Sequence, residues 1–134
     1  MADLATRTRS GPGRILITVY AVFALAATAR SAVQIGTRFD EAPLAYLLSA
    51  FAAVVYIVAT VSLARGNRTS RRVATVSIVV ELVGVLTVGT LSLVDPQAFP
   101  DATVWSDYGQ GYGYVPAVLP LLGLWWLRVT ARTN

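Results

Sequence analysis

Two ionisable residues, Glu81 and Arg30, lie inside long apolar stretches of the sequence and are the first candidates for chemistry. A charge in the hydrocarbon part of a bilayer is costly, so such residues usually face protein or water and often have a function. Near the middle of its stretch, Glu81 can bind a proton or a ligand. Equally, the two charges can form a polar clamp that fixes helix packing, and the sequence leaves both interpretations open.

Polar residues at helical spacing accompany the two charges. Gln34 follows Arg30 by four residues. One stripe facing the bundle is expected to contain Tyr20, Ala24, Ala27, Ser31 and Gln34, and a second one Tyr46, Ser49, Ala53, Tyr56 and Thr60. Tyr56 falls at about the depth of Glu81, so its hydroxyl is expected to reach the carboxyl group. The sequence therefore predicts a buried polar cluster of Arg30, Gln34, Tyr46, Ser49, Tyr56 and Glu81.

The helix face that contains Glu81 also contains small residues. Ser77, Glu81, Gly84 and Val88 are at helical spacing and share one face. Because small residues let helix backbones approach closely, we expect Gly84 and Gly89 to receive another helix.

The segment Thr103–Pro120, TVWSDYGQGYGYVPAVLP, is the third notable feature. Its candidate contact residues are Trp105, Asp107, Tyr108 and Tyr112. Gly111 and Gly113 favour a tight, non-helical approach to the next helix, and the loop is expected to fold over the outer mouth of the bundle. An interfacial aromatic anchor and a contact site for a ligand or partner both remain possible. The glycine pattern is not a nucleotide fingerprint, because no strand precedes it.

Several classes of chemistry are excluded by missing residue types. The chain has no Cys and no His, and all eleven of its basic residues are Arg. Disulfides, thiolate and imidazole metal sites, Schiff-base chemistry and a Walker A loop are therefore ruled out. No motif of paired carboxylates with nucleophile or metal spacing is present, so we expect no enzyme activity, no metal and no cofactor.

Composition places the chain in a membrane. Of its 134 residues, 55% are hydrophobic and only 13% are charged, about half the charged fraction of a soluble domain. Four stretches reach the roughly 20 apolar residues that a membrane helix needs: about 15–37, 43–64, 73–94 and 111–130. The sequence thus predicts an all-α membrane protein with one domain over 1–134, folded as an antiparallel four-helix transmembrane bundle. Residues 1–13 are expected to be a flexible tail, and 95–110 an extracytoplasmic loop.

The arginines predict the orientation. They gather before the first span, between the second and third spans, and after the fourth, whereas the other side has Arg38 among five acidic residues. By the positive-inside rule, both termini are cytoplasmic and the protein is a multi-pass protein of the bacterial cell (inner) membrane. The net charge of +4 is accounted for by anionic lipid. The expected partners are the lipid bilayer and a membrane protein or a second copy, with no nucleic acid.

Four segments together resemble an uncharacterised family of small four-span integral membrane proteins of actinobacteria. They are Ala26–Ile35, Ala42–Ala50, Glu81 with Leu82, and Thr103–Pro116. The resemblance covers about 14–128, implies a location in the cell membrane and supplies no activity. Small multidrug exporters are similar in length and architecture, but their membrane glutamate belongs to the first helix, whereas this chain has Arg30 in its first span and Glu81 in its third.

The favoured function is a structural or accessory subunit of a membrane complex, since the chain is small and lacks the usual catalytic residues. The alternative is a small homodimeric transporter, or a membrane protein that binds lipid or small molecules through buried Glu81 and Arg30. A membrane enzyme that uses Glu81, Asp101 or Asp107 is the least favoured hypothesis.

Overall fold

The computed structural model describes residues 11–99, 103 and 105–133, and their regular structure is entirely helical. The four long helices are α2 (Gly11–Arg38), α3 (Pro43–Arg65), α4 (Arg68–Val94) and α5 (Val115–Thr133). Three short 3₁₀ helices connect them: η1 (Phe39–Glu41), η2 (Pro96–Ala98) and η3 (Ser106–Tyr112). The predicted all-helical class is confirmed. Residues 1–10 of the predicted tail and Asp101 of the predicted loop lie outside the described residues. Residues 11–13, which were also predicted to be tail, belong to α2.

Three of the helices are long and apolar enough to cross a membrane, namely those that contain the first three predicted spans. The fourth predicted span, 111–130, differs from the structure. Residues 111 and 112 belong to η3, and the apolar part of α5 is the shorter stretch Val115–Thr130. The structure therefore supports a helical membrane protein with three candidate spans, and α5 is a shorter apolar helix.

A Gly-Asn pair, Gly66 and Asn67, forms the turn between α3 and α4. Gly66 ends α3 in the left-handed conformation, with φ of 69°, which a residue without Cβ adopts at little cost. Asn67 then caps α4, because its side-chain oxygen accepts a hydrogen bond of 2.8 Å from the Ser70 amide. At the other end of α3, Pro43 occupies the first turn, where a missing N–H is harmless.

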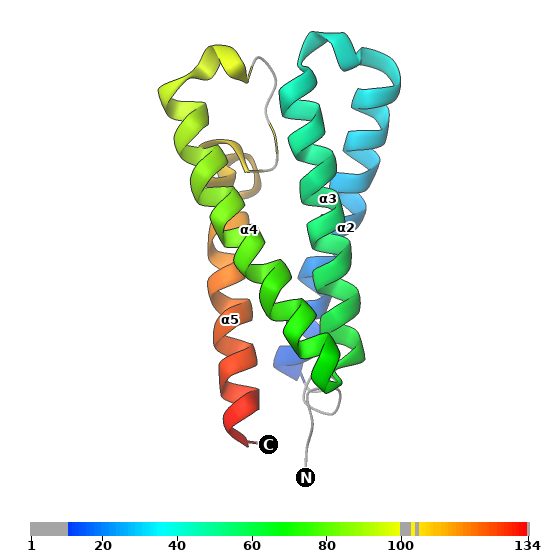
Figure 1. Ribbon diagram of the computed structural model, residues 1–134, viewed down its shortest axis with the longest axis vertical. Helices are drawn as coiled ribbons and strands as arrows, with labels where there is room; N and C mark the ends of the chain where they lie inside the picture. The colour runs from blue at the N-terminus through cyan, green and yellow to red at the C-terminus, as the bar shows by residue number, and fades with distance from the viewer. Residues whose placement is uncertain (1–10, 100–102, 104, 134) are drawn as a thin grey trace.

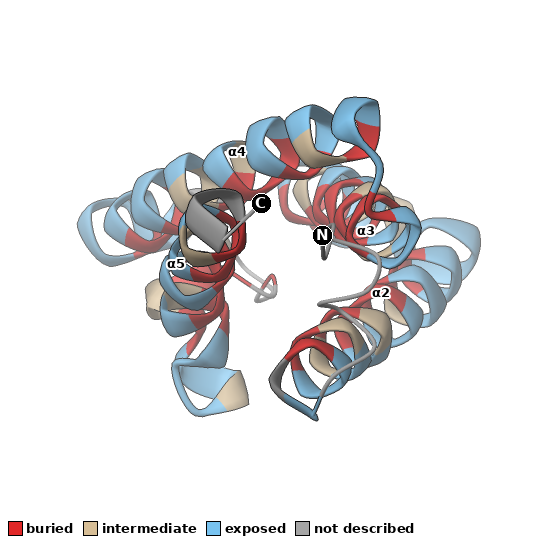
Figure 2. Ribbon diagram, turned by 90° about the horizontal axis from the view of Figure 1, so that it is seen from below, coloured by how far each residue is buried: buried red, intermediate tan, exposed pale blue. Residues whose placement is uncertain are grey.

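Successive long helices run in opposite directions, as Figure 1 shows. The start of α2, the α3–α4 turn and the end of α5 lie at one end of the molecule, and η1 and η2 lie at the other. Extensive packing joins α2 to α3, α3 to α4, and α4 to α5. Buried residues face the space between the helices and exposed residues face outward (Figure 2).

The polar stripes read from the sequence are on the inside. All five residues of the first stripe, Tyr20 to Gln34, are buried, as are Tyr46, Ser49, Ala53 and Tyr56 of the second; Thr60 is partly exposed. The outer faces of the helices are instead apolar, with exposed Leu25, Val54 and Val83 among many others. This polar-inside, apolar-outside arrangement suits a lipid environment rather than water.

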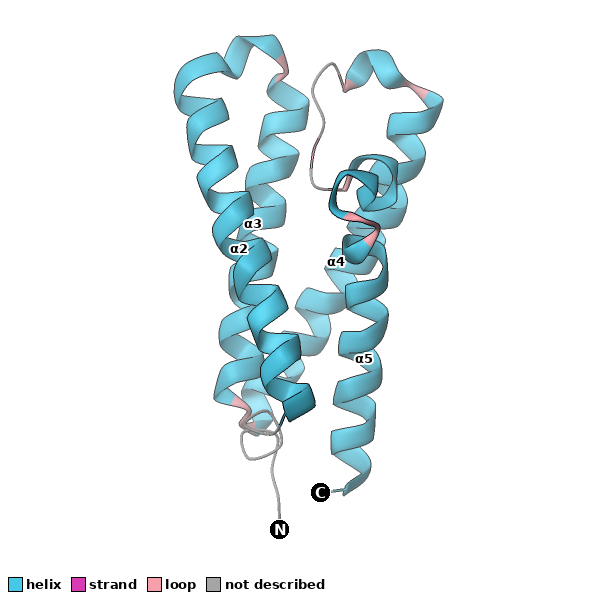
Figure 3. Cartoon of the chain, turned by 180° about the vertical axis from the view of Figure 1, so that it is seen from behind, coloured by secondary structure: helices cyan, strands magenta, loops and turns pink. Residues whose placement is uncertain are grey.

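The connection between α4 and α5 does not stay at the end of the bundle. After η2 it returns toward the middle of the molecule, so that η3 lies beside α4 above the start of α5 (Figure 3). The loop was expected to cover the outer mouth of the bundle. Its η3 segment instead packs against the side of α4. This placement brings aromatic side chains of the loop close to the polar interior.

Candidate functional site

Glu81 lies in the middle of the bundle and is fully buried. The Tyr20 hydroxyl of α2 donates a hydrogen bond of 2.7 Å to its Oε1. The other oxygen, Oε2, has no hydrogen-bond partner in the described part of the chain. A buried polar group without a partner is costly, so this oxygen is available to accept a hydrogen bond or a proton.

Tyr56 of α3 is also fully buried and lies close enough to Glu81 for an electrostatic interaction. The Tyr56 hydroxyl interacts with the Glu81 carboxyl group, although no described residue forms a hydrogen bond of full geometry with Oε2. The same hydroxyl accepts a hydrogen bond of 3.0 Å from the indole Nε1 of Trp105. The Tyr20 and Tyr56 rings are 6.2 Å apart at their centroids. Two phenol groups, those of Tyr20 and Tyr56, therefore lie beside Glu81.

The face of α4 that holds Glu81 also holds the folded-in loop. A Cβ built on Gly84 would lie 2.5 Å from Cζ3 of Trp105, and a Cβ on Gly89 would overlap the ring of Tyr108. The two glycines were expected to receive another helix. They receive two aromatic rings of the loop, because the loop rather than a helix covers this part of α4.

Polar contacts reinforce the docking of the loop on α4. Ser92 Oγ accepts a hydrogen bond of 2.9 Å from the Asp107 amide, and the hydroxyls of Thr90 and Tyr108 are 2.8 Å apart. Asp107, Tyr108 and Tyr114 adopt positive φ values of 52°, 61° and 63°. Such conformations cost of order 1–3 kcal/mol each for residues with a side chain, so the contacts with α4 must offset that cost.

Arg30 is directed toward the loop and not toward Glu81. Its Nη1 donates a hydrogen bond of 3.1 Å to the Tyr112 hydroxyl, and the Tyr112 ring packs against Phe23 at 5.5 Å. No ion pair joins Glu81 to Arg30 in the described part of the chain. The Glu81 carboxyl group bonds to Tyr20, whereas Arg30 bonds to Tyr112.

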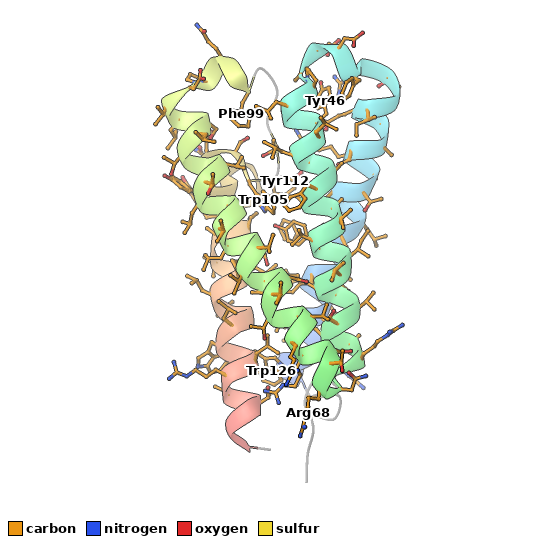
Figure 4. The ribbon with its side chains drawn as sticks, in the orientation of Figure 1. Tyr46, Arg68, Phe99, Trp105, Tyr112 and Trp126 are labelled. Atoms are coloured by element: carbon orange, nitrogen blue, oxygen red, sulfur yellow. The ribbon has the colours of Figure 1, made fainter. Side chains whose placement is uncertain are left out.

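The predicted cluster therefore does not come together as a single group. Tyr56 lies with Glu81, whereas Arg30 lies higher, next to the loop. Tyr46 packs with Ala42, Ala45 and Phe99 at the far end, in the upper part of Figure 4. Gln34 and Ser49 are buried, and Gln34 Oε1 and Ser49 Oγ have no hydrogen-bond partner in the described ranges.

The four candidate contact residues of the loop do not form an exposed surface patch. Trp105 is 1% exposed, so it is not available to a partner. Asp107, Tyr108 and Tyr112 are partly exposed. Figure 4 shows Trp105 and Tyr112 pointing into the space between α4 and the α2–α3 pair. Asp107 and Tyr112 also line an open pocket of about 590 Å³, bordered by Arg30.

Sequence reasoning did not identify Tyr20 and Trp105 as partners in the network around Glu81. Tyr20 was assigned to the inward-facing stripe, and counting residues from the paired ends of α2 and α4 would have suggested its depth. Nothing in the sequence indicates that Trp105 turns inward. In the described part of the chain, no group of three His, Cys, Asp or Glu residues can hold a metal ion. The arrangement can bind a proton or a hydrogen-bond donor at Glu81.

Comparison with known proteins adds no relative. The chain matches no protein family model, no curated protein and no solved structure. The resemblance to small actinobacterial membrane proteins therefore stays a prediction, and the function must be argued from the geometry.

Proposed function

We propose that the chain is a four-span protein of the bacterial cell membrane and serves as a structural or accessory subunit of a membrane complex. The observation that carries this proposal is the hydrogen bond from Tyr20 to Glu81, which ties α2 to α4 through the middle of the bundle. A second hydrogen bond, from Trp105 to Tyr56, ties the loop to α3. Polar groups used in this way fix helix order and rotation.

The outer faces support the same proposal. The interior polar groups are buried between the helices, so a partner would meet the exposed apolar faces of the helices. Small and apolar surfaces pack against other membrane helices by van der Waals contact. In this proposal α5 is the fourth span, and η3, which packs against α4 and α5, covers the outer end of its short apolar stretch.

The orientation can be tested because the chain has no cysteine. We propose that both termini and the α3–α4 turn are cytoplasmic, with η1 outside, as the arginines favour. A cysteine at Arg68 should react with a membrane-impermeant maleimide only after cells are permeabilised, and a cysteine at Asp40 should react in intact cells. Both side chains are exposed. The cysteine-free parent is the control, and labelling of Arg68→Cys in intact cells would reverse the proposed orientation.

The accessory role predicts that a larger membrane protein is retained in stoichiometric amount when the chain is purified gently from its native membrane. Native mass spectrometry measures this directly. Glu81→Gln should lower the thermal stability of the protein, because Gln alters the acceptor for Tyr20. Glu41→Gln is the matched control, since Glu41 is exposed in η1. Recovery of the chain alone, with Glu81→Gln as stable as the parent, would contradict the accessory role.

A second function is favoured by one observation, the unpaired Oε2 of Glu81. A small homodimeric transporter, or a protein that binds lipid or small molecules, would use this oxygen to bind a proton or ligand. Arg30 borders two open pockets of about 450 and 590 Å³ and would contact an anionic group there. This alternative predicts a lone dimer in the same purification, and a Glu81→Gln variant that folds normally but loses its response to substrate.

A further inference from the structure

An apolar groove lies between α2 and α5, away from Glu81 and the loop. It has a volume of about 290 Å³ and is lined mainly by Ile15, Leu16 and Val19 of α2 and by Leu122, Trp125 and Trp126 of α5. The groove is open at its side. Extensive packing runs from α2 through α3 and α4 to α5, so the first and last helices face each other without such packing (Figure 2).

The groove lies toward the arginine-rich end of the molecule. Its α2 residues belong to the first turns of that helix, and its tryptophans belong to the second half of α5. Trp126 is labelled in the lower part of Figure 4, at the level where α4 begins. Tryptophan is enriched at the membrane–water interface. In the orientation proposed above, the groove therefore opens at the level of the inner leaflet.

Two polar features stand at this end of the groove. The indole Nε1 of Trp126 is buried and has no acceptor in the described part of the chain. Arg128 is exposed and continues the row Leu122, Trp125, Arg128, in which each residue follows the last by three positions. Arg71 is already engaged, because its Nη2 donates to the Leu127 carbonyl at 3.1 Å. Arg14 of α2 and Arg128 of α5 are both exposed at this end, and Arg128 is the one that follows the lining residue Trp125 by three positions on α5. We therefore assign Arg128 as the cation that contacts a ligand in the groove.

The lining of the groove suits a hydrocarbon chain. The residues that border it are aliphatic side chains and two tryptophans. A linear hydrocarbon fits such a space. An apolar channel that ends in an N–H donor and then a guanidinium matches the acyl chain, the ester carbonyl and the phosphate of a phospholipid in that order.

We propose that this groove binds one anionic phospholipid of the inner leaflet. One acyl chain lies between α2 and α5, the Trp126 indole donates to an ester carbonyl, and Arg128 holds the phosphate. This site depends on membrane insertion but not on the accessory role, so either can fail without the other.

Quenching of tryptophan fluorescence by brominated lipids tests the site in the full chain. The protein is reconstituted in phosphatidylcholine vesicles, and part of the lipid is replaced by phosphatidylglycerol or phosphatidylcholine with dibrominated acyl chains. One arginine near the surface is worth about 1 kcal/mol toward anionic lipid. Brominated phosphatidylglycerol should therefore quench to half-maximum at about fivefold lower mole fraction than brominated phosphatidylcholine.

Two pairs of variants decide the outcome. Arg128→Gln should abolish the preference for phosphatidylglycerol, and Arg65→Gln, an exposed arginine at the end of α3, should keep it. Val19→Phe should fill the groove and reduce quenching by both lipids, whereas Val22→Phe, on the exposed side of α2, should not. Helix content by circular dichroism checks that each variant folds. If Val19→Phe fails to fold, Arg128→Gln and Arg65→Gln still test the site, because both arginines are exposed.

Three results would overturn the proposal. One is equal quenching by the two brominated lipids in the parent protein. Another is a preference that survives Arg128→Gln unchanged. The third is protection from both lipids together with cross-linking of two copies through α2 and α5, which would assign the groove to a second copy of this chain.

Discussion

Replacing Gly84 with alanine is expected to lower the free energy of unfolding by about 1–3 kcal/mol, the usual cost of overpacking a filled interior. The new Cβ would lie 2.5 Å from Cζ3 and 2.7 Å from Cη2 of Trp105. The ring cannot yield easily, because Trp105 is buried, bonded to Tyr56 and in edge contact with Phe51 at 6.2 Å. The whole loop would have to shift away from α4.

Gly36→Ala is the matched control for this prediction. Gly36 also lies within a long helix, but a Cβ there meets nothing within 4 Å. Alanine should be neutral at this position or stabilising by up to about 1 kcal/mol. Unfolding in mixed micelles, followed by the tryptophan fluorescence of the two variants, measures the difference. If both variants behaved alike, the ring of Trp105 would not be docked against Gly84.

Removing the Tyr20 hydroxyl with Tyr20→Phe is expected to cost about 1–3 kcal/mol of unfolding free energy, because it leaves a buried acceptor without its partner. The ring would stay in place, so the loss reports the hydrogen bond to Glu81 and not the packing. Tyr114→Phe is the control, since Tyr114 is half exposed. The same micelle titration supplies both values.

A double-mutant cycle separates the Tyr20–Glu81 bond from general damage. Glu81→Leu alone leaves the Tyr20 hydroxyl unpaired, whereas the double variant Tyr20→Phe with Glu81→Leu removes both partners. Replacing both partners by apolar groups can be nearly neutral. The loss of unfolding free energy in the double variant should therefore be smaller than the summed losses of the two single variants, by at least about 0.5 kcal/mol. Strictly additive losses would mean that the two side chains do not interact in the folded protein.

These two predictions concern two neighbouring contacts of α4. The Tyr20–Glu81 bond fixes α2 against α4, and the close approach at Gly84 fixes the loop against α4. Both place α4 at the centre of the structure, since it contacts α3, α5 and η3. A structural subunit needs such rigidity, and a transporter would need this same region to rearrange around Glu81.

The sequence by itself determined the helices and the faces that they bury. A run of about 20 apolar residues has few alternatives to a helix in lipid, because every backbone N–H and C=O must be paired within the segment. Spacing of three and four residues then indicates which side is polar, and Tyr20, Gln34, Tyr46 and Tyr56 are all buried as their stripes predict. The Gly66–Asn67 turn likewise follows from local backbone preferences.

Only the tertiary structure decided which polar groups meet. Arg30 bonds to Tyr112 and Glu81 to Tyr20, whereas periodicity alone suggested that Arg30 and Glu81 would lie together. Helical spacing specifies a face and a depth, but a hydrogen bond depends on tilt and rotation to within a fraction of an ångström. The position of the α4–α5 loop was also decided by the tertiary structure. It brings Trp105 to Tyr56, which is 49 positions away in the sequence. No local pattern encodes that path, because it depends on the space that Gly84 and Gly89 leave on a helix elsewhere in the chain.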